Sequence, residues 1–238
     1  YDYTLDDTGR RRAILEANGR HTQYGFDDLY RLTSETITDA VNGHYSASYQ
    51  YDWVGNRIHS LIDGVSTTYS YDDNDRLETQ GSTTYGYDNN GNQTSQLDNG
   101  EATEYHYDGK NKLIGLQKNG FEVASYTYNH NGIRTGKTEN GQTTEFVVDS
   151  NRDYAQVLLE TDGTSQIHYS YGHDLIQQTR GGQASFYLYD GLGSTRALAD
   201  SAGTVTDRYD YEAFGEVRSQ TGNTENSYLY TGEQFDQT

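Results

Sequence analysis

The chain has 238 residues, and its 36 acidic side chains outnumber its 17 Lys and Arg side chains, which gives a formal net charge of −19. Nucleic acid and anionic membrane surfaces bind proteins through Lys and Arg, so neither is an expected partner. Cysteine is absent, which excludes disulfides and thiolate metal sites. No apolar run approaches the roughly 18 residues of a membrane span, and no signal-peptide pattern follows Tyr1. We therefore expect a cytosolic protein or an internal piece of a longer, exported chain.

An aromatic pair of the form Tyr-x-Tyr, usually followed by Asp, recurs about every twenty residues, a period typical of stacked supersecondary units. Only 32% of the residues are hydrophobic, so the 24 tyrosines are expected to supply most of the core. The residues that define the repeat are Tyr49, Tyr51, Asp52, Tyr69, Tyr71, Asp72, Tyr85, Tyr87, Asp88, Tyr105, Tyr107, Asp108, Tyr126, Tyr128, Tyr187, Tyr189 and Asp190. Looser copies are Tyr24-Gly25-Phe26, Tyr169-Ser170-Tyr171 and Tyr209-Asp210-Tyr211.

A second sequence pattern recurs with the same period as the aromatic pairs. Two-residue turn sequences fall between successive aromatic pairs, and Asn-Gly and Asp-Gly favour the type I′ turns of β-hairpins. The predicted turns are Asn18-Gly19, Asn42-Gly43, Asp63-Gly64, Asn99-Gly100, Asn119-Gly120, Asn140-Gly141, Asp162-Gly163 and Gly181-Gly182. Each repeat is therefore predicted to be a hairpin, with the tight turns on one edge of the sheet and the loops that follow Tyr-Asp on the other.

These patterns predict an all-β fold of tandem β-hairpin repeats that form a curved antiparallel sheet. The two rings of each Tyr-x-Tyr pair should share one face of a strand, because side chains alternate faces. An open sheet of this many strands normally curls. No stretch has the sustained apolar spacing of a helix, so no helix is expected.

The block Asp190-Gly191-Leu192-Gly193-Ser194-Thr195-Arg196 is followed by Tyr209-Asp210-Tyr211-Glu212-Ala213-Phe214-Gly215. With the repeated Tyr-Asp signature, these motifs resemble the RHS, or YD-repeat, family, whose RHS-associated core has a D-x-L-G-S-T-R block followed by Y-D-P-F-G. Ala213 stands where that pattern has proline. The resemblance implies that the sheet spirals as part of an RHS β-shell. It also implies a YD-repeat hairpin array at residues 1–185 and, continuous with the same sheet, the start of the RHS-associated core at residues 186–238.

The family includes bacterial polymorphic toxins, the cocoon-forming components of insecticidal Tc toxins, and animal teneurins. The resemblance implies a non-enzymatic structural segment of a shell that encapsulates or scaffolds a C-terminal toxin or effector in a secreted or surface bacterial protein. Its partners would then be the rest of its own longer chain and that cargo. The alternative is an extracellular adhesion or carbohydrate-binding module, with a cell-surface receptor or a glycan as its partner.

Acidic pairs such as Asp27-Asp28 and Asp72-Asp73 could serve as glycosidase carboxylates, but their recurrence in the repeats favours loop caps. The histidines have no recognisable metal-ligand spacing. The sequence thus predicts no catalytic residue, no cofactor and no metal site. Cations follow most loops and are expected to pair with the Asp beside the preceding aromatic, forming ladders between neighbouring hairpins; they are Arg31, Arg57, Arg76, Lys112 and Arg134.

Overall fold

The computed structural model describes residues 1–152 and 154–236. These residues form 22 β-strands and one short 3₁₀-helix, and the paired strands that are adjacent in sequence run antiparallel. The chain divides into two compact units: unit 1 is Tyr1–Gly86 with Gln96–Gly100, and unit 2 is Tyr87–Ser95 with Glu101–Thr238. The predicted all-β array of antiparallel hairpins is confirmed.

The first strands along the chain are β1 (Asp2–Leu5), β2 (Arg11–Leu15), β3 (His21–Phe26), β4 (Leu32–Thr38), β5 (Tyr45–Tyr51), β6 (Arg57–Ile62), β7 (Val65–Tyr71), β8 (Leu77–Gln80), β9 (Thr83–Tyr87) and β10 (Gln93–Asp98). They are followed by β11 (Glu101–Tyr107), β12 (Leu113–Lys118), β13 (Phe121–Tyr128), β14 (Arg134–Glu139), β15 (Gln142–Asp149), β16 (Gln156–Thr161), β17 (Gln166–Tyr171), β18 (Leu175–Arg180), β19 (Gln183–Tyr189), β20 (Thr195–Ala199), β21 (Val205–Tyr211) and β22 (Val217–Thr221).

In most hairpins that carry an aromatic pair, a β-bulge lies next to the second aromatic. In the β5–β6 pair, Gln50 lies opposite His59 and Tyr51 lies opposite Arg57, so Ile58 is the extra residue. The same register shift precedes the second aromatic of other repeats, at Phe26, Tyr71, Tyr107, Tyr128, Tyr171, Tyr189 and Tyr211. Because a bulge bends a strand and increases its twist, its repetition at one position gives successive hairpins a common local geometry.

The tight turns adopt two conformations. Both central residues have positive φ at Asp63-Gly64, Asn99-Gly100, Asn119-Gly120, Asn140-Gly141 and Gly181-Gly182, which confirms type I′ geometry there. The type I′ prediction is wrong at Asn18-Gly19, Asn42-Gly43 and Asp162-Gly163, where only the glycine has positive φ. At the last of these, Asp162 Oδ1 accepts the N–H groups of Thr164 (2.8 Å) and Ser165 (2.6 Å), so a side-chain cap stabilises a wider loop.

Tyrosine rings form much of the buried core, as expected. In unit 1 the rings of Tyr45 and Tyr49 pack with Ile37 and Ala47. In unit 2 a smaller cluster consists of Leu116, Ala124 and Tyr126, and a larger one consists of Ile167, Tyr169, Leu175, Tyr187, Leu198, Tyr209, Tyr211, Tyr228 and Leu229. The rings of Tyr187 and Tyr189 are stacked at 5.9 Å with an interplanar angle of 6°, so this pair shares one face of its strand.

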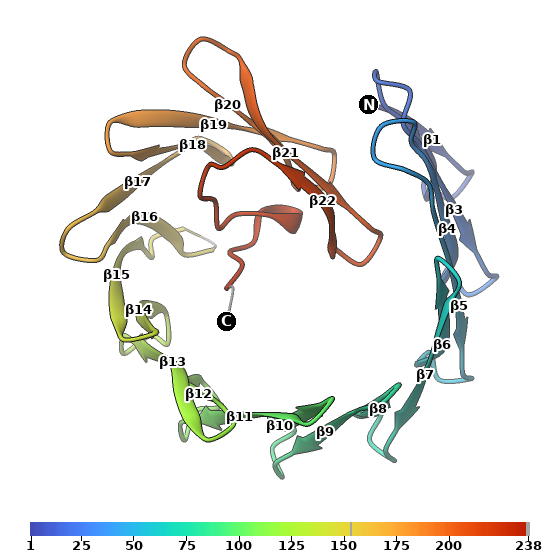
Figure 1. Ribbon diagram of the computed structural model, residues 1–238, viewed down its shortest axis with the longest axis horizontal. Coiled ribbons are helices and arrows are strands. Elements are labelled where there is room, and N and C mark those ends of the chain that lie inside the picture. The colour runs from blue at the N-terminus through green and yellow to red at the C-terminus, as the bar shows by residue number, and fades with distance from the viewer. Residues whose placement is uncertain (153, 237–238) are drawn as a thin grey trace. The chain divides into compact units, whose positions relative to one another are not determined.

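In unit 2 the strands follow one another around the C-terminal segment, residues 223–236 (Figure 1). This segment contains the 3₁₀-helix, Tyr230–Gly232, so the expectation of no helix is wrong at this point. Thr231 and Gly232 both have positive φ, and the N–H of Glu233 donates to the Tyr230 carbonyl. A single turn of this kind has no apolar periodicity, and a sequence pattern therefore could not reveal it.

We expect Gly120→Ala to destabilise unit 2 by about 1–2 kcal/mol, because a side chain raises the energy of left-handed backbone. Gly120 has a φ of 80°, and a Cβ there would meet nothing within 4 Å, so backbone conformation alone opposes the substitution. Gly109→Ala is the matched control, since Gly109 is also in open space but lacks positive φ. Urea denaturation followed by circular dichroism measures both; an equal loss in the two variants would contradict the assignment of a strained turn.

Candidate functional site

The structure places the predicted repeat residues at equivalent positions of successive hairpins. The first aromatic of each pair lies inside a strand; Tyr49, Tyr126 and Tyr187 are buried, and Tyr69, Tyr85 and Tyr105 are half-buried. The second aromatic lies at the end of the strand, and the Asp that follows it starts the loop. The position between the two aromatics faces away from the rings and is exposed in most repeats.

In six repeats the hydroxyl group of the second tyrosine donates to the hairpin before it. Tyr128 Oη donates to the carbonyl of Leu113 at 2.7 Å, and Leu113 is the first residue of β12. The same bond joins Tyr51 to Leu32 (2.6 Å), Tyr71 to Arg57 (3.0 Å), Tyr107 to Gln93 (3.0 Å), Tyr189 to Leu175 (2.7 Å) and Tyr211 to Thr195 (2.8 Å). The sequence analysis missed these bonds, although every acceptor is the first residue of a strand.

The Asp after the second aromatic caps its own loop. Asp72 Oδ1 accepts the N–H groups of Asn74 (2.9 Å) and Arg76 (3.0 Å), while Oδ2 accepts Arg76 Nε at 2.7 Å. Hydrogen bonds from the Arg76 side chain and backbone lower the pKa of Asp72 to about 2. Asp27, Asp52, Asp88, Asp108 and Asp190 accept loop N–H groups in the same manner. The recurrent carboxylates therefore stabilise loops.

The predicted pairing of these cations with the Asp beside the preceding aromatic occurs at Arg31 and Arg76, but both ion pairs lie within one loop rather than between neighbouring hairpins. Arg31 and Arg76 form ion pairs within their own loops, at 2.7 Å with Asp27 and 2.6 Å with Asp72. The guanidinium of Arg57 instead lies over the ring of Tyr69, 4.6 Å from its centroid. In both ion pairs the cation lies four residues after the carboxylate. Arg31 also contacts the adjacent loop, because its Nη1 donates to the carbonyl of Asp52 (2.8 Å).

Acid is expected to destabilise the protein as the pH falls from about 4 toward 2, because the unfolded carboxylate titrates near 3.9. The pKa values of Asp72 and Asp162 are about 2 in the folded protein, so their contribution is complete above pH 4 and is lost on protonation. Asp72→Asn should make the urea midpoint depend less on pH in this range. The matched control is Asp73→Asn, at an exposed neighbouring position. The same pH dependence in both variants would argue against the cap as its source.

The Gly193-Ser194-Thr195-Arg196 block receives the C-terminal segment. Ser194 and Thr195 are fully buried. The N–H of Thr231 donates to Ser194 Oγ at 3.0 Å, and Thr195 donates from Oγ1 to the carbonyl of Tyr228 at 2.8 Å and from its N–H to the carbonyl of Leu229 at 2.9 Å. The block therefore supplies small hydroxyl side chains and one backbone N–H group to which residues 228–231 bind.

Arg196 binds the neighbouring strand β21, and Gly215 contacts the C-terminal segment. Arg196 is the extra residue of the β19–β20 bulge, and its guanidinium binds the carbonyl of Tyr209 (2.9 Å) and the carboxylate of Asp210 (2.5 Å). Gly215 has a φ of 96°, and a Cβ there would lie 2.5 Å from the Tyr230 ring. Only glycine lets that ring approach so closely.

The remainder of the C-terminal segment crosses the ring-bearing face of β16 to β19. Asn226 is buried; its Oδ1 accepts the Tyr187 hydroxyl (2.9 Å) and the N–H of Tyr228 (3.0 Å), and its Nδ2 donates to the Tyr228 carbonyl (2.9 Å). Glu160, also buried, accepts Tyr169 Oη at 3.0 Å and Gln234 Nε2 at 2.9 Å. Burial raises the pKa of this carboxyl group.

Asn226→Ala is expected to loosen the C-terminal segment, because it leaves buried hydrogen-bonding groups unpaired at a cost of about 1–3 kcal/mol each. Hydrogen exchange of residues 223–236 should become faster, while exchange in β5 and β6 should not change. Asn223→Ala is the matched control, since Asn223 is an exposed residue of the same segment. Unchanged exchange in Asn226→Ala would mean that other contacts hold the segment.

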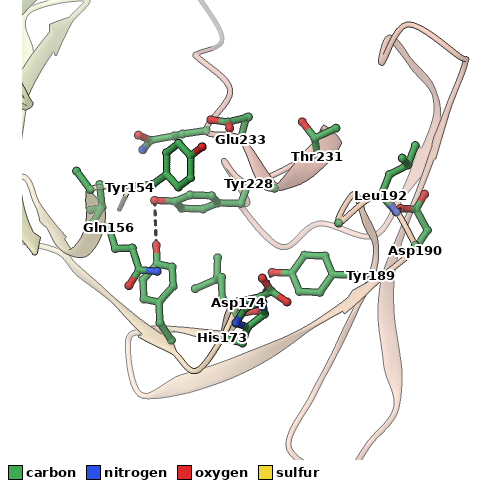
Figure 2. Close-up of a pocket in the computed structure, with 18 of the residues that line it drawn as sticks. Tyr154, Gln156, His173, Asp174, Tyr189, Asp190, Leu192, Tyr228, Thr231 and Glu233 are labelled. Carbon is green, nitrogen blue, oxygen red and sulfur yellow. Dashed lines mark hydrogen bonds between the residues drawn. The ribbon is translucent and has the colours of Figure 1, made fainter. Parts of the chain in front are cut away.

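A cavity of about 840 Å³ opens where this segment meets the loops after β15, β17 and β19. Figure 2 shows Asp174 and Tyr189 on one side of it and Tyr154, Tyr228 and Glu233 on another. The hydroxyl groups of Tyr228 and Tyr171 lie 3.4 Å apart at its edge (Figure 2). The sequence patterns include some residues of this wall, namely Arg134, Tyr171, Tyr189 and residues 190–193. Most of the other lining residues belong to separate segments with no shared period.

Within residues 1–152 and 154–236, no group of three or more His, Asp and Glu side chains is placed to hold a metal ion. No helix in that same part of the chain has the length and apolar character needed to cross a membrane.

This array of bulged hairpins tied through tyrosine and aspartate matches a known family. The model of the Teneurin YD-shell family matches residues 8–232, and the chain belongs to that family. The resemblance to the RHS, or YD-repeat, family is therefore confirmed.

One curated relative is the tRNA3(Ser)-specific nuclease WapA of Bacillus spizizenii, with 34% identity over 92 residues; the match covers 36% of this chain and 4% of WapA. Similar solved structures include a crystal structure of TcdB2-TccC3-TEV, with 15% identity, a TM-score of 0.46 and coverage of 100% of this chain and 17% of that one. The Photorhabdus luminescens Tc holotoxin pore has 15% identity, a TM-score of 0.43 and coverage of 100% and 16%. The chain thus spans only a small part of each of these proteins.

Proposed function

We propose that this chain is a non-enzymatic segment of an RHS shell that encloses or scaffolds a C-terminal toxin or effector in a secreted or surface bacterial protein. A structural shell role is supported by the family match over residues 8–232. The observation that carries the proposal is the structural role of the repeated Tyr and Asp side chains. The second tyrosines bind the preceding hairpin and the aspartates cap loops, so both residue types serve the wall itself.

We also propose that residues 1–185 form the hairpin array and that residues 186–238 begin the RHS-associated core within the same sheet. Strand β19 spans this boundary and pairs with β18 on one side and β20 on the other, which supports continuity. Ser194 and Thr195 of the core bind the C-terminal segment, as do residues of the array such as Glu160 and Gln178.

The position of the C-terminal segment suggests the face of the sheet at which cargo would enter. Residues 223–236 lie on the ring-bearing face of β16 to β21 and are held there by Ser194, Thr195 and Tyr187. An effector that followed this segment would enter on that face. The partners implied by the proposal are therefore the rest of the same chain and the effector.

Protease protection tests this proposal in the natural full-length protein with an epitope tag at its C-terminus. We expect the tagged effector region to survive digestion in the intact protein and to be degraded when it is expressed alone. Tyr128→Ala together with Tyr189→Ala should remove protection, because both the inter-repeat bond and ring packing are lost. Tyr154→Ala, at an 87% exposed ring, is the control. Equal digestion of the enclosed and isolated effector would refute enclosure.

A further inference from the structure

We infer that the cavity beside the C-terminal segment binds an organic cation, a primary ammonium or guanidinium group. The cavity volume of about 840 Å³ suits a small molecule or one long side chain. Its wall combines tyrosine rings with carboxylates, the two groups that attract such a cation. This site is separate from the shell role and does not depend on it.

The carboxylates of Asp174 and Glu233 are available for a ligand. Both residues are exposed, and among the described residues neither carboxylate has a hydrogen-bond or ion-pair partner. The other charged groups at the wall are already engaged. Asp190 accepts the N–H groups of Leu192 (2.9 Å) and Ser194 (3.1 Å), and Arg134 is paired with Asp236. The unpaired charge that faces the cavity is therefore negative.

The tyrosine rings of the wall are held in fixed positions. Tyr189 stacks on Tyr187 and donates its hydroxyl to the Leu175 carbonyl at 2.7 Å, so one face of its ring is already covered. Tyr228 packs edge-on against Tyr169, with ring centroids 5.1 Å apart. Rings that are already immobilised lose little conformational entropy when a ligand binds.

Tyr154 adds a third, more accessible ring. Its side chain is 87% exposed, and Figure 2 shows it near Glu233 and Tyr228. A cation within about 6 Å of a ring centroid is attracted by the ring quadrupole, and a nearby carboxylate increases that attraction. The pairing of ring and acid occurs on both sides of the cavity, with Asp174 beside Tyr189 and Glu233 beside Tyr154 (Figure 2).

The two carboxylates and the tyrosine rings together favour an organic cation over other classes of ligand. An anion would be repelled by Asp174 and Glu233, and a divalent metal ion would require more carboxylate or imidazole ligands than the described residues bring together. A neutral ligand would leave the two carboxylates without a partner. An extended alkyl chain ending in an ammonium or guanidinium group contacts the rings along its stem and the carboxylates at its head.

The test is titration of the 238-residue chain, monitored by NMR, with probes from two sources of the same chemistry. Cadaverine represents a free amine, and acetyl-Ala-Lys-Ala-amide represents a polypeptide side chain. Pentanediol and acetyl-Ala-Gln-Ala-amide are the neutral matches. We expect saturable binding of at least one cation, weakened by added salt, and no binding of its neutral match. Binding of cadaverine alone would identify a free amine as the ligand, and binding of the peptide would identify a protein side chain.

Variants locate the site. Asp174→Asn combined with Glu233→Gln should weaken binding about tenfold or more, and Tyr154→Ala about threefold. All three positions are exposed, so the fold should persist, and circular dichroism would verify this. Asp73→Asn removes an exposed carboxylate in unit 1 and should bind as wild type does. The inference would be overturned if neither cation bound, if the neutral probes bound equally well, or if the double variant bound like the wild type.

Discussion

This array depends on one contact, a side-chain hydrogen bond between neighbouring repeats. The second tyrosine of one repeat donates its hydroxyl to the first residue of the second strand in the preceding hairpin. A chain with 32% hydrophobic residues cannot build a thick core, so each hairpin must be held by its neighbours. Tyrosine suits this task because its ring supplies apolar area while its hydroxyl satisfies a carbonyl left open beside the bulge. The bulge and the bond occur together in several repeats, as at Tyr128 and Leu113, whereas the Tyr171 hydroxyl beside its bulge is bonded to Tyr228.

The repeat aspartates stabilise the loops that connect the strands. A carboxylate that accepts several backbone N–H groups fixes a short polar loop without any apolar contact. At Asp72, hydrogen bonds from the Arg76 side chain and backbone lower the pKa of the carboxyl group. The Tyr-Asp signature therefore joins two functions of the wall in adjacent residues. The tyrosine connects one hairpin with the previous one, and the aspartate shapes the connection to the next strand.

In unit 2 the C-terminal segment forms an additional layer over the sheet. The block around Ser194 and Thr195 keeps the strand register of an ordinary repeat, yet its small hydroxyl side chains bind the C-terminal segment. That segment covers buried tyrosines such as Tyr169 and Tyr187 and, with the adjacent loops, forms the wall of the cavity. The small hydroxyl side chains at the start of β20 thus allow this part of the sheet to bind the C-terminal segment.

The sequence by itself determined the hairpins, the loop caps and the turns at positions such as Asn119-Gly120, because these features depend on residues a few positions apart. It failed at Asp162-Gly163, where a side-chain cap competes with the turn, and at the 3₁₀-helix. Only the tertiary structure decided which face of unit 2 the C-terminal segment covers and which residues line the cavity. The contacts involved, such as Thr195 with Tyr228 and Arg134 with Asp236, join distant residues and follow no period, so no local pattern encodes them.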